Sequence, residues 1–520
     1  MRYAYEEFPY ETPPPLRGAA EGRKPAVIVG AGPVGLALAI DLATRGVPTV
    51  VLDDNNVVSV GSRAICWAKR TLEIFDRLGV GERMVAKGVT WKIGRTRHRD
   101  REVFQFDLLP EDGHKAPAFI NLQQYHVEQY LVERCRDFPA LIDLRFRNRV
   151  TAVERFGAHA AATVETPDGA YRIEADWLLA CDGAGSPIRR MMGLDFAGEL
   201  FEERFLIADI EMKADFPPER WFWFEPPFHN GQSALLHKQP DDIWRIDLQL
   251  GWDADPDVEK RPENVIPRIR KIVGDRPFEI DWVSVYTFQC RRLERFVHGR
   301  VVFVGDSAHI VSPFGARGGN GGIQDVDNLG WKLAAVLAGE AGPALIESYD
   351  AERRHGADEN ILNSARATKF MTPAEGAERR YRDAVLALAG HAPFARRMVN
   401  SGRLSLPCAY PPSPFIGPDD PALPVASAPG RPCPDAPVEG GWLLERLRNG
   451  FTVLGLGAEP PEVPGAARLR LEPGPHLRAR YLGEAPSAIY LIRPDQHVAA
   501  RWREAGAEAV AAALRAAKGA

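Results

Sequence analysis

The chain lacks the features of a disulfide-stapled, secreted or membrane-spanning protein. Its six cysteines are scattered along 520 residues with no CxxC pair, a usage typical of reduced thiols. No apolar stretch is long enough to cross a bilayer, and the first residues carry acids and prolines instead of a signal peptide. We therefore expect a cytoplasmic protein without membrane contact. The cysteines are Cys66, Cys135, Cys181, Cys290, Cys408 and Cys433.

The chain also lacks the short motifs of metalloproteases, P-loop proteins and α/β-hydrolases. It has no HExxH, no metal-spaced His/Cys cluster, no GxxxxGK[ST] and no GxSxG, so we expect no metal site. Lys and Arg number 65 and Asp and Glu number 70, and this net charge of −5 argues against a nucleic-acid partner. The content of 45% hydrophobic and 26% charged residues is that of an ordinary globular protein, and 520 residues predict two or three domains.

What the chain does have is a glycine-rich connection between a strand and a helix. Val301–Val304 is a short apolar run that predicts a buried strand, and Asp306 follows it, where open α/β sheets hold their ligands. Five glycines occur within residues 315–322, and an apolar helical face begins at Ile323. Such a turn presents backbone N–H groups and the positive end of a helix dipole to an electron-rich ligand. The alternative is a tight connection without a ligand. We rank it lower, because a carboxylate at a strand end and five glycines in one connection are costly unless they bind a ligand.

A second glycine turn, near the N-terminus, predicts a dinucleotide site. Strand Ala26–Val29 leads into GAGPVG at residues 30–35, a helix follows, and strand Thr49–Leu52 ends at an acid 23 residues beyond Gly30. The first glycine makes the turn, the second admits the pyrophosphate, the third lets helix pack on strand, and the acid binds ribose hydroxyls. The predicted contacts are Gly30, Gly32, Pro33, Val34, Gly35, Asp53 and Asp54.

With both motifs, the chain resembles the FAD-dependent aromatic hydroxylases, the single-component flavoprotein monooxygenases that include 4-hydroxybenzoate hydroxylase and phenol hydroxylase. The resemblance rests on GDSAHIVSPFGARGGN at residues 305–320 and on the helix after it. It implies FAD as cofactor, with Asp306 on the ribityl chain, Pro313 against the isoalloxazine ring and the amides of residues 317–320 at its N1–C2 edge. Gly315, Gly318, Gly319 and Asn320 complete this predicted cradle.

Three more cofactor contacts follow from the same resemblance. Arg63 matches a family arginine that contacts the FAD phosphates. We expect its segment, Ser62-Arg63-Ala64, to open a helix. The alternative is an arginine on the solvated face of that helix. Gln124 matches the family glutamine near the ribityl and phosphate groups, with Gln123 as a rival. Asp182-Gly183 matches a motif that orients backbone around FAD and the nicotinamide cofactor, although Asp-Gly is also a common turn.

Between residues 201 and 296 the pattern changes to alternating polar and apolar residues, which predicts an antiparallel sheet. In the family this sheet covers the flavin ring and carries the substrate, so its polar face contains the candidates. We expect His237 and Arg245 to be catalytic together with Pro313, although a lone histidine is more often satisfied locally. The predicted substrate contacts are Trp223, His237, Asp247, Tyr286 and Pro313, with a core role as the alternative for the two aromatic residues.

The predicted fold is α/β, with a Rossmann-like FAD-binding domain, an antiparallel substrate sheet and a C-terminal thioredoxin-like domain without CxxC. The last of these follows from a resemblance of Ile492-Arg493-Pro494-Asp495 to the phenol hydroxylase branch. We expect a final helix from Gln496 to Lys518. The predicted divisions are an N-terminal arm (1–24), the FAD-binding domain (25–200 and 297–400), the substrate sheet (201–296), a Pro-rich linker (401–429) and the last domain (430–520).

The resemblance implies an enzyme that hydroxylates a phenol-like ring with NAD(P)H and O2, through a flavin C4a-hydroperoxide. A small aromatic substrate and a homodimer are expected. One alternative is an epoxidase or hydroxylase of a polyketide or other non-aromatic substrate, and another is a non-catalytic flavin- or nucleotide-binding protein. The sequence leaves open the substrate, the choice between NADH and NADPH, the regiochemistry and the base that ionises the substrate.

Overall fold

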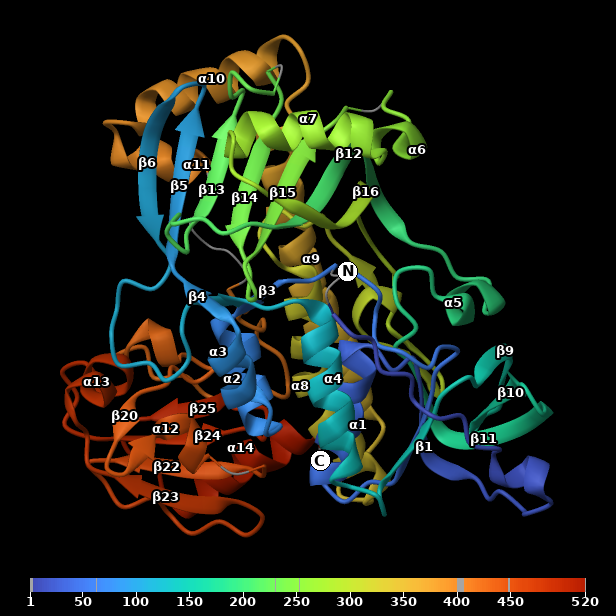
Figure 1. Cartoon of the computed structure of the whole chain (residues 1–520). Helices are drawn as coiled ribbons and strands as arrows, with labels where there is room; N and C mark the ends of the chain where they lie inside the picture. The colour runs from blue at the N-terminus through green and yellow to red at the C-terminus, as the bar shows by residue number, and fades with distance from the viewer. Residues whose placement is uncertain are drawn as a thin grey trace.

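The computed structural model describes residues 3–61, 63–229, 231–251, 253–399, 406–447 and 449–519. Two eight-stranded sheets dominate this part of the chain, and a four-stranded sheet forms the core of the C-terminal unit. Figure 1 shows the antiparallel sheet at the top, the sheet containing β1 below it and the red C-terminal unit at the lower left. No helix among the described residues is long and apolar enough to span a bilayer.

The first large sheet has the strand order β17-β18-β11-β1-β2-β8, with β9 and β10 extending β11 as an antiparallel meander. Its central strands are parallel and almost wholly buried, as the apolar runs at Ala26–Val29 and Thr49–Leu52 predict. The strands are β1 (Lys24–Val29), β2 (Thr49–Leu52), β8 (Ile142–Arg145), β9 (Arg149–Arg155), β10 (Ala160–Thr166), β11 (Gly169–Ala180), β17 (Val297–His298) and β18 (Val301–Phe303).

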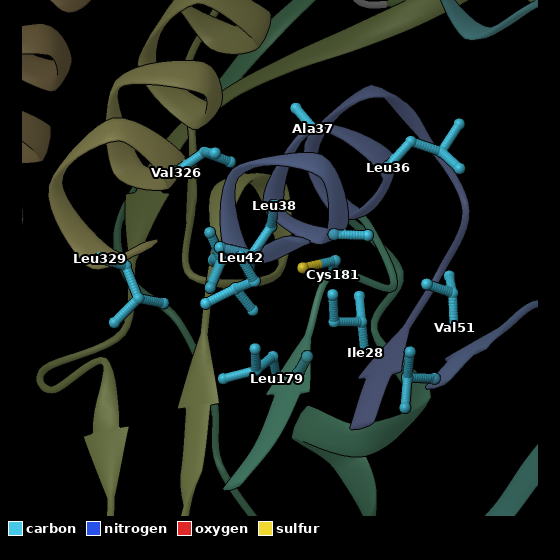
Figure 2. Packing of buried hydrophobic residues seen from close by; sticks show 14 of the residues in the cluster. Ile28, Leu36, Ala37, Leu38, Leu42, Val51, Leu179, Cys181, Val326 and Leu329 are labelled. Atoms are coloured by element: carbon cyan, nitrogen blue, oxygen red, sulfur yellow. The ribbon is translucent and has the colours of Figure 1, made fainter. Parts of the chain in front are cut away.

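Helix α1 (Pro33–Thr44) is buried on nearly all sides because it lies between this sheet and α8 (Gly318–Leu337). Figure 2 shows Leu38 and Leu42 of α1 between Ile28 and Leu179 of the sheet and the α8 residue Val326. Packing from both sides fixes the start of each helix at the carboxyl edge of the strands. The other helices of this region are α2 (Lys69–Arg77), α3 (Gly81–Lys87), α4 (Gln124–Arg136) and α5 (Pro187–Met191).

The second large sheet has the order β19-β16-β12-β15-β14-β13-β5-β6. It is wider than the predicted range 201–296, because a hairpin at residues 93–107 joins it through a parallel pairing of β5 with β13. The strands are β5 (Ile93–His98), β6 (Arg101–Asp107), β12 (Ala197–Glu211), β13 (Arg220–Phe224), β14 (Ala234–Lys238), β15 (Ile243–Gln249), β16 (Glu279–Arg292) and β19 (His309–Ile310).

The two faces of this sheet have different neighbours. Its outer face packs Trp244, Ile246 and Leu248 against α7 (Pro262–Val273), which follows the short α6 (Pro256–Glu259). Its inner face meets the apolar sides of α9, α10 and α11 and, nearer the first sheet, a cavity. These helices are α9 (Ala344–Met371), α10 (Ala377–Ala389) and α11 (Pro393–Val399). Residues 243–250 therefore show the alternation that the sequence predicts within residues 201–296.

Two predicted helices are wrong in their bounds. Arg63 and Ala64 precede β3 (Cys66–Ala68), and the helix begins only at Lys69; Ser62 lies outside the described residues. Pairing of β3 with β7 (Phe119–Asn121), and of β7 with β4 (Val89–Trp91), holds this segment extended. The predicted helix from Gln496 is a strand, β25 (Val498–Trp502), followed by α14 (Ala507–Lys518). Ladder bonds to a neighbouring strand override helix propensity in both places.

The N-terminal arm and the Pro-rich linker are both packed against the body. Phe8 is buried and stacks on Phe146, and a 3-10 turn, η1, covers Pro14–Arg17. In the linker, Tyr410 is buried and stacks on His497 of the C-terminal unit. Residues 401–405 of the linker, like the first two of the arm, lie outside the described residues.

The C-terminal unit has the strand order β23-β22-β24-β25, in which only the first pair is parallel. Its further elements are η3 (Val425–Ser427), β20 (Pro437–Val438), β21 (Gly441–Trp442), α12 (Leu443–Arg446), α13 (Pro475–Leu477) and η4 (Arg478–Leu482). The four strands are β22 (Thr452–Leu456), β23 (Ala467–Leu471), β24 (Ala488–Ile492) and β25.

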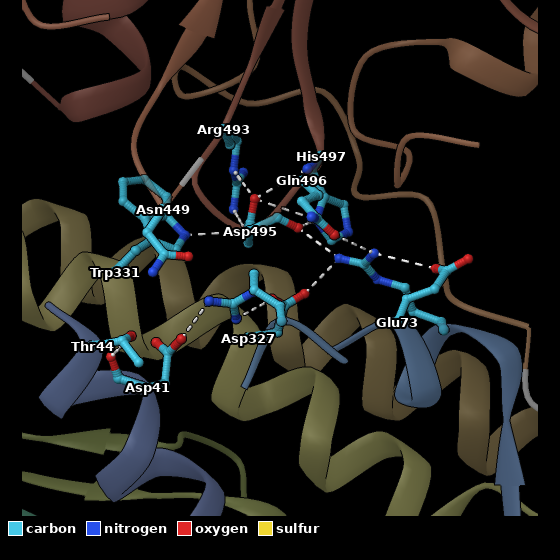
Figure 3. Close-up of polar contacts among 12 residues, drawn as sticks. Asp41, Thr44, Glu73, Asp327, Trp331, Asn449, Arg493, Asp495, Gln496 and His497 are labelled. Atoms are coloured by element: carbon cyan, nitrogen blue, oxygen red, sulfur yellow. Dashed lines mark hydrogen bonds and ion pairs between the residues drawn. The ribbon is translucent and has the colours of Figure 1, made fainter. Parts of the chain in front are cut away.

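Buried ion pairs fasten this unit to the rest of the chain (Figure 3). Arg493 donates to both carboxylate oxygens of Glu352 on α9, at 2.7 and 2.9 Å, and to Asp495 at 2.6 Å. Asp495 accepts from the indole of Trp331 on α8 at 3.1 Å. Burial alone raises the pKa of Glu352, but the charges of Arg493 and Lys332 outweigh it and lower that pKa to about 2. Each charge in this interface therefore depends on its partners.

We predict that Arg493→Met lowers the free energy of unfolding by about 3 kcal/mol, because Glu352 and Asp495 each lose a buried partner. Arg503→Met is the matched control, since Arg503 pairs with Asp420 at the surface, 2.8 Å away. Denaturant unfolding of both variants measures the difference. Equal stability of the two variants would show that the interface does not depend on this pair.

Candidate active site

A cavity of about 570 Å³ lies between the two large sheets and receives residues from segments far apart in the sequence. A second cavity of about 530 Å³, between α2, α3 and the C-terminal unit, contains none of the predicted site residues. The predicted residues that line the first cavity are Gly30, Gly32, Pro33, Val34, Asp53, Asp54, Arg63, Gln124, Asp182, His237, Arg245, Asp247, Tyr286, Asp306, Pro313, Gly318, Gly319 and Asn320. Gly35, Gly315 and Trp223 do not line it.

The first glycine turn has the geometry of a dinucleotide cradle. Gly30 has φ 107°, and a Cβ there would lie 2.4 Å from the carbonyl oxygen of Cys181. A Cβ on Gly35 would lie 1.9 Å from the carbonyl oxygen of Gly30, so Gly35 serves the packing of α1 on the strand and not the cavity. A Cβ on Gly32 would meet no atom within 4 Å, which leaves space for a ligand against the backbone.

Asp53 stands at the end of β2, where it accepts from the backbone N–H of Ala31 at 2.5 Å and of Asn55 at 2.8 Å. Burial raises the pKa of Asp53 to about 6, and the backbone bonds only partly offset that effect. The carboxylate is thus held at the cavity wall in a place where its ionisation is costly. A hydroxyl donor in the cavity would favour the ionised form.

Asp306 lies in η2 (Gly305–Ser307), directly after β18. Its side chain is exposed, but toward the cavity and below the protein surface, and its carboxylate accepts no hydrogen bond from the part of the chain that the structure describes. The surrounding protein raises the pKa of Asp306, although His309 and Arg63 oppose the shift. A carboxylate so placed is available to a ligand that donates hydrogen bonds.

The N-terminus of α8 faces the same cavity through Gly318, Gly319 and Asn320. The Asn320 side chain is fully used within the protein, since it accepts from Ala68 N–H at 2.9 Å and donates to the Cys66 carbonyl at 2.9 Å. It therefore fastens β3 to α8, and the contribution of this segment to a ligand comes from its backbone N–H groups. Gly315, with φ 100°, shapes the turn before the helix.

The structure separates the two rival glutamines. Gln124 lines the cavity and binds the backbone N–H of Ala64 at 3.1 Å, whereas Gln123 is buried and points to the carbonyl of Pro240. Arg63 lies beside Gln124 at the cavity wall with its side chain exposed. The hydrogen bond between Ala64 and Gln124 thus joins the loop before β3 to the start of α4 at the cavity wall.

Asp182 closes the cradle from the side of β11. Its Oδ2 accepts from the Ser186 hydroxyl at 2.8 Å and from Ile188 N–H at 3.0 Å, which orders the turn before α5. Its Oδ1 is buried and has no hydrogen-bond partner among the described residues. Burial raises the pKa of this carboxyl. An unpartnered acceptor on the cavity wall fits a polar ligand.

On the inner face of the second sheet, His237 and Asp247 line the cavity side by side. The His237 Nε2 and an Asp247 oxygen are 3.4 Å apart, but in an orientation too poor for a hydrogen bond, so both ring nitrogens lack a partner among the described residues. Only 1% of His237 is exposed. Burial, followed by the charge of Arg220, lowers the pKa of His237 to about 4, so the ring is neutral at pH 7.

Arg245 lies in the same face with its charge already satisfied. Its Nε and Nη2 donate to the two oxygens of Asp209, each at 2.8 Å. This bidentate pair makes Arg245 a support for the sheet face and leaves no charge for a substrate. Tyr286 lines the cavity, whereas Trp223 lies on the outer face against Phe228, so the predicted substrate contact of Trp223 is corrected to a core role.

The sequence reasoning missed Arg220, the first residue of β13, which is buried and lines the cavity. Its signal was present in RWFWF at residues 220–224, where a single charged residue begins an otherwise aromatic strand. Alternation places Arg220 on the face of Phe222, opposite to Trp221 and Trp223. Which face meets the cavity is decided only by the assembled sheets.

The residues fit a dinucleotide along one half of the cavity and a small substrate at the other. Gly32 leaves backbone space, the N-terminus of α8 offers N–H groups, and Asp53, Asp182 and Asp306 offer carboxylate oxygens toward the cavity. The sheet above adds a buried histidine and carboxylate. Fold and site together define an α/β protein with a dinucleotide-type cradle in a cavity that the second large sheet covers.

Comparisons with known proteins identify the family. Residues 23–364 match the FAD binding domain family. The 12-dehydrotetracycline 5-monooxygenase/anhydrotetracycline 6-monooxygenase of Streptomyces rimosus subsp. rimosus is 29% identical over 528 residues, covering 95% of this chain and 98% of the relative. Para-nitrophenol 4-monooxygenase of Pseudomonas sp. is 29% identical over 386 residues, covering 70% and 91%. The solved flavin-dependent monooxygenase PieE has a TM-score of 0.81 at 23% identity, covering 96% of this chain and 100% of that one.

Since that match covers more than half of the sequence, the chain belongs to the FAD binding domain family. The protein is a FAD-dependent monooxygenase. The resemblance inferred from the two glycine motifs and the prediction of FAD as cofactor are both confirmed. The contacts of individual residues with FAD stay predictions, although most of these residues line one cavity.

We predict that Asp306→Ala weakens FAD binding by roughly a hundredfold, the loss of a charge-assisted hydrogen bond of about 1.5 to 3 kcal/mol. The measurement is the ratio of FAD to protein after gel filtration, together with FAD titration of the apoprotein. Asp358→Ala, which removes a surface carboxylate paired with Arg292, is the control. Full retention of FAD in Asp306→Ala contradicts the assignment.

We predict that FAD affinity rises between about pH 5 and pH 7, because the pKa of Asp53 is raised to about 6 and only the carboxylate accepts a ribose hydroxyl strongly. Below that pKa, each pH unit lowers affinity by up to about tenfold. Asp53→Asn is expected to bind FAD more weakly and to lose this part of the pH dependence. Titration of flavin fluorescence at several pH values tests both points, and identical profiles for the two proteins would rule out the assigned contact.

Proposed function

We propose that this monooxygenase hydroxylates a phenol-like aromatic ring. One oxygen atom of O2 enters the ring in place of hydrogen, the other leaves as water, and NAD(P)H with one proton supplies the two electrons. The observation that carries the proposal is the position of His237 and Asp247, buried together in the cavity that also contains the dinucleotide cradle. A phenol there has a neutral base beside its hydroxyl group.

The cofactor and the chain have separate tasks. Bound FAD supplies the redox chemistry that activates oxygen. The chain has to hold the substrate ring, exclude water and accept a proton. Ionising a phenol makes its ring more electron-rich and so more reactive toward an electrophilic oxygen. The apolar side of the cavity, with Tyr286 and Phe288, suits the ring itself.

His237 is the base that we assign. Burial lowers the pKa of His237 to about 4, so the ring is neutral at pH 7, and its unpartnered ring nitrogens leave it free to accept a hydrogen bond from the phenol. The neighbouring His237, Arg245 and Arg220 hold the pKa of Asp247 below its usual range against the effect of burial, so this carboxylate stays ionised. It then stabilises the imidazolium that forms when His237 takes the phenolic proton.

The names of two relatives support this substrate class. One acts on para-nitrophenol, a simple acidic phenol, and another on anhydrotetracycline. An epoxidase or a hydroxylase of a non-aromatic polyketide is less favoured, because a substrate without an acidic hydroxyl has no use for the buried base. A non-catalytic binding protein is disfavoured by membership of the family.

We infer that the C-terminal unit is thioredoxin-like and structural. Its strand order, with one parallel and two antiparallel pairings, supports this assignment. Without a CxxC pair it has no dithiol chemistry. Its buried contacts with α8 and α9 suit a unit that stabilises the helix behind the cofactor. The predicted homodimer stays a prediction.

We predict that His237→Ala retains FAD but lowers substrate-stimulated NAD(P)H oxidation by about ten- to a hundredfold, since one hydrogen bond to the substrate is worth about 1–3 kcal/mol. More hydrogen peroxide and less hydroxylated product are expected for each NAD(P)H consumed. A panel of phenols, followed by NAD(P)H absorbance and product analysis, makes the measurement. His229→Ala is the control, because His229 is equally buried but binds the carbonyl of Gln249 outside the cavity.

A further inference from the structure

The connection between β2 and β3 is an irregular segment of the cavity wall. None of the described residues between the two strands belongs to a helix or a strand, so the shape of this segment depends on contacts with its neighbours. We call residues 53–64 the cofactor loop, because it begins at the predicted ribose contact Asp53 and contains the predicted phosphate contact Arg63. The loop residues that line the cavity are Asp53, Asp54, Ser59, Arg63 and Ala64.

Two neighbours of the cofactor loop belong to the body of the protein. On α4, Glu128 accepts a hydrogen bond from the Ser59 hydroxyl at 2.7 Å. In the second large sheet, Arg245 donates to the carbonyl oxygen of Arg63 at 3.3 Å. These contacts fasten the loop from the side of the helix and from the side of the sheet.

The third neighbour is the N-terminal arm. The backbone N–H of Phe8 donates to the carbonyl oxygen of Asn56 at 2.7 Å, and the Asn56 side-chain amide donates back to the carbonyl oxygen of Phe8 at 3.4 Å. The Phe8 ring is buried and stacks on Phe146, with 4.6 Å between the ring centroids. The arm is therefore anchored in the core at the same residue that pairs with the cofactor loop.

Tyr5 of the arm reaches the part of the cofactor loop that precedes Arg63. Its hydroxyl oxygen accepts from the backbone N–H of Gly61 at 2.9 Å, and its ring packs beside Tyr125 of α4, with 6.0 Å between the centroids. Gly61 has φ 75°, and a Cβ there would lie 2.3 Å from the indole nitrogen of Trp282 on β16. Gly61 is thus enclosed between the arm and the second large sheet, two residues before Arg63.

We propose that the N-terminal arm is part of the FAD site, and that Tyr5 is a positioning residue that holds the cofactor loop, with Arg63, against the cavity. The inference rests on the predicted contact of Arg63 with the FAD phosphates and does not involve the aromatic substrate. A loop that is already held in place loses less conformational freedom when FAD binds, so docking of the arm favours binding. By linkage, bound FAD then stabilises the docked arm to the same extent.

The variant Tyr5→Phe removes the hydroxyl group and keeps the ring. We expect the FAD affinity of the apoprotein to fall about three- to tenfold, the effect of one hydrogen bond between neutral groups. Tyr10→Phe is the matched control, because Tyr10 belongs to the same arm but its hydroxyl binds Thr166, 3.1 Å away, and Asp168 at the turn between β10 and β11. Titration of flavin fluorescence gives the affinity, and the release of FAD after dilution gives the dissociation rate.

Hydrogen exchange tests the reverse direction, since the N–H of Phe8 that binds Asn56 reports on docking of the arm. In the wild type we expect peptides that cover residues 3–10 to exchange more slowly with FAD than without it, and we expect this difference to shrink in Tyr5→Phe. Peptides from α14, at the far end of the chain, are the internal control and are expected to exchange alike in both states.

A double-mutant cycle tests the route through Arg63. Tyr5→Phe is expected to weaken FAD binding much less in an Arg63→Gln background than in the wild type, because the loop then has no charge to position. Additive effects would overturn the assignment. So would an FAD affinity of Tyr5→Phe equal to that of the wild type, exchange of the arm that FAD does not change, or a fall in the Tm of the apoprotein that accounts for the loss of FAD.

Discussion

The site depends on one buried carboxylate, Asp325, in the second turn of α8. It accepts from Gly305 N–H at 3.0 Å, from His309 Nε2 at 2.6 Å and from Arg353 Nε at 2.6 Å, and it is fully buried. These contacts join the strand end before Asp306, the short strand after it and helix α9 to one point of α8. A displaced carboxylate would leave the Arg353 guanidinium, the His309 ring and a backbone donor without this partner in the interior. The Asp306 carboxylate and the start of α8 therefore keep a common orientation toward the cavity.

The following part of α8 is held in a similar way by α2 and by the C-terminal unit. Asp327 pairs with Arg70 at 2.8 Å and with Arg77 at 2.9 Å, and Trp331 donates to Asp495. Buried ion pairs of this kind contribute little net stability, but each is strongly destabilising to break. Their effect is to allow one arrangement of helix and domain. Helix α8, whose N-terminus faces the cavity, is thus fastened along its length.

Three residues of the cavity wall keep buried polar atoms without hydrogen bonds among the described residues: Asp182, His237 and Arg220. The buried charges around α8, such as Asp325 and Asp327, differ in that each has an ion-pair partner. Unpartnered groups cost stability in the ligand-free chain and gain partners when ligands bind. Asp182 lies beside the first glycine turn, whereas His237 and Arg220 lie on the inner face of the second sheet, so they occupy the two ends of one cavity.

The sequence by itself predicted residues that line one half of the cavity, because its signals there are local. The turn at Gly30, the acid Asp53 and the glycine-rich start of α8 each combine a backbone requirement with a chemical one within a few residues, and each lines the cavity as predicted, through Gly30, Asp53 and Gly318. The alternation in residues 243–250 likewise determined which residues share a face, since side chains in a strand have a period of two. Extended segments such as β3 were missed because their partners are distant in the sequence.

Only the tertiary structure decided which of these faces meets the cavity and which charged side chains already have an ion-pair partner within the protein. Arg245 and Arg220 look equivalent as single arginines in apolar strands, but Asp209 lies beside the first and no carboxylate lies within ion-pair distance of the second in the described chain. Trp223 and Tyr286 are both strand aromatics, and the packing of α7 on one face assigns the former to the core. Partnering of charges depends on register between strands that are far apart in the chain, and no local pattern encodes that register.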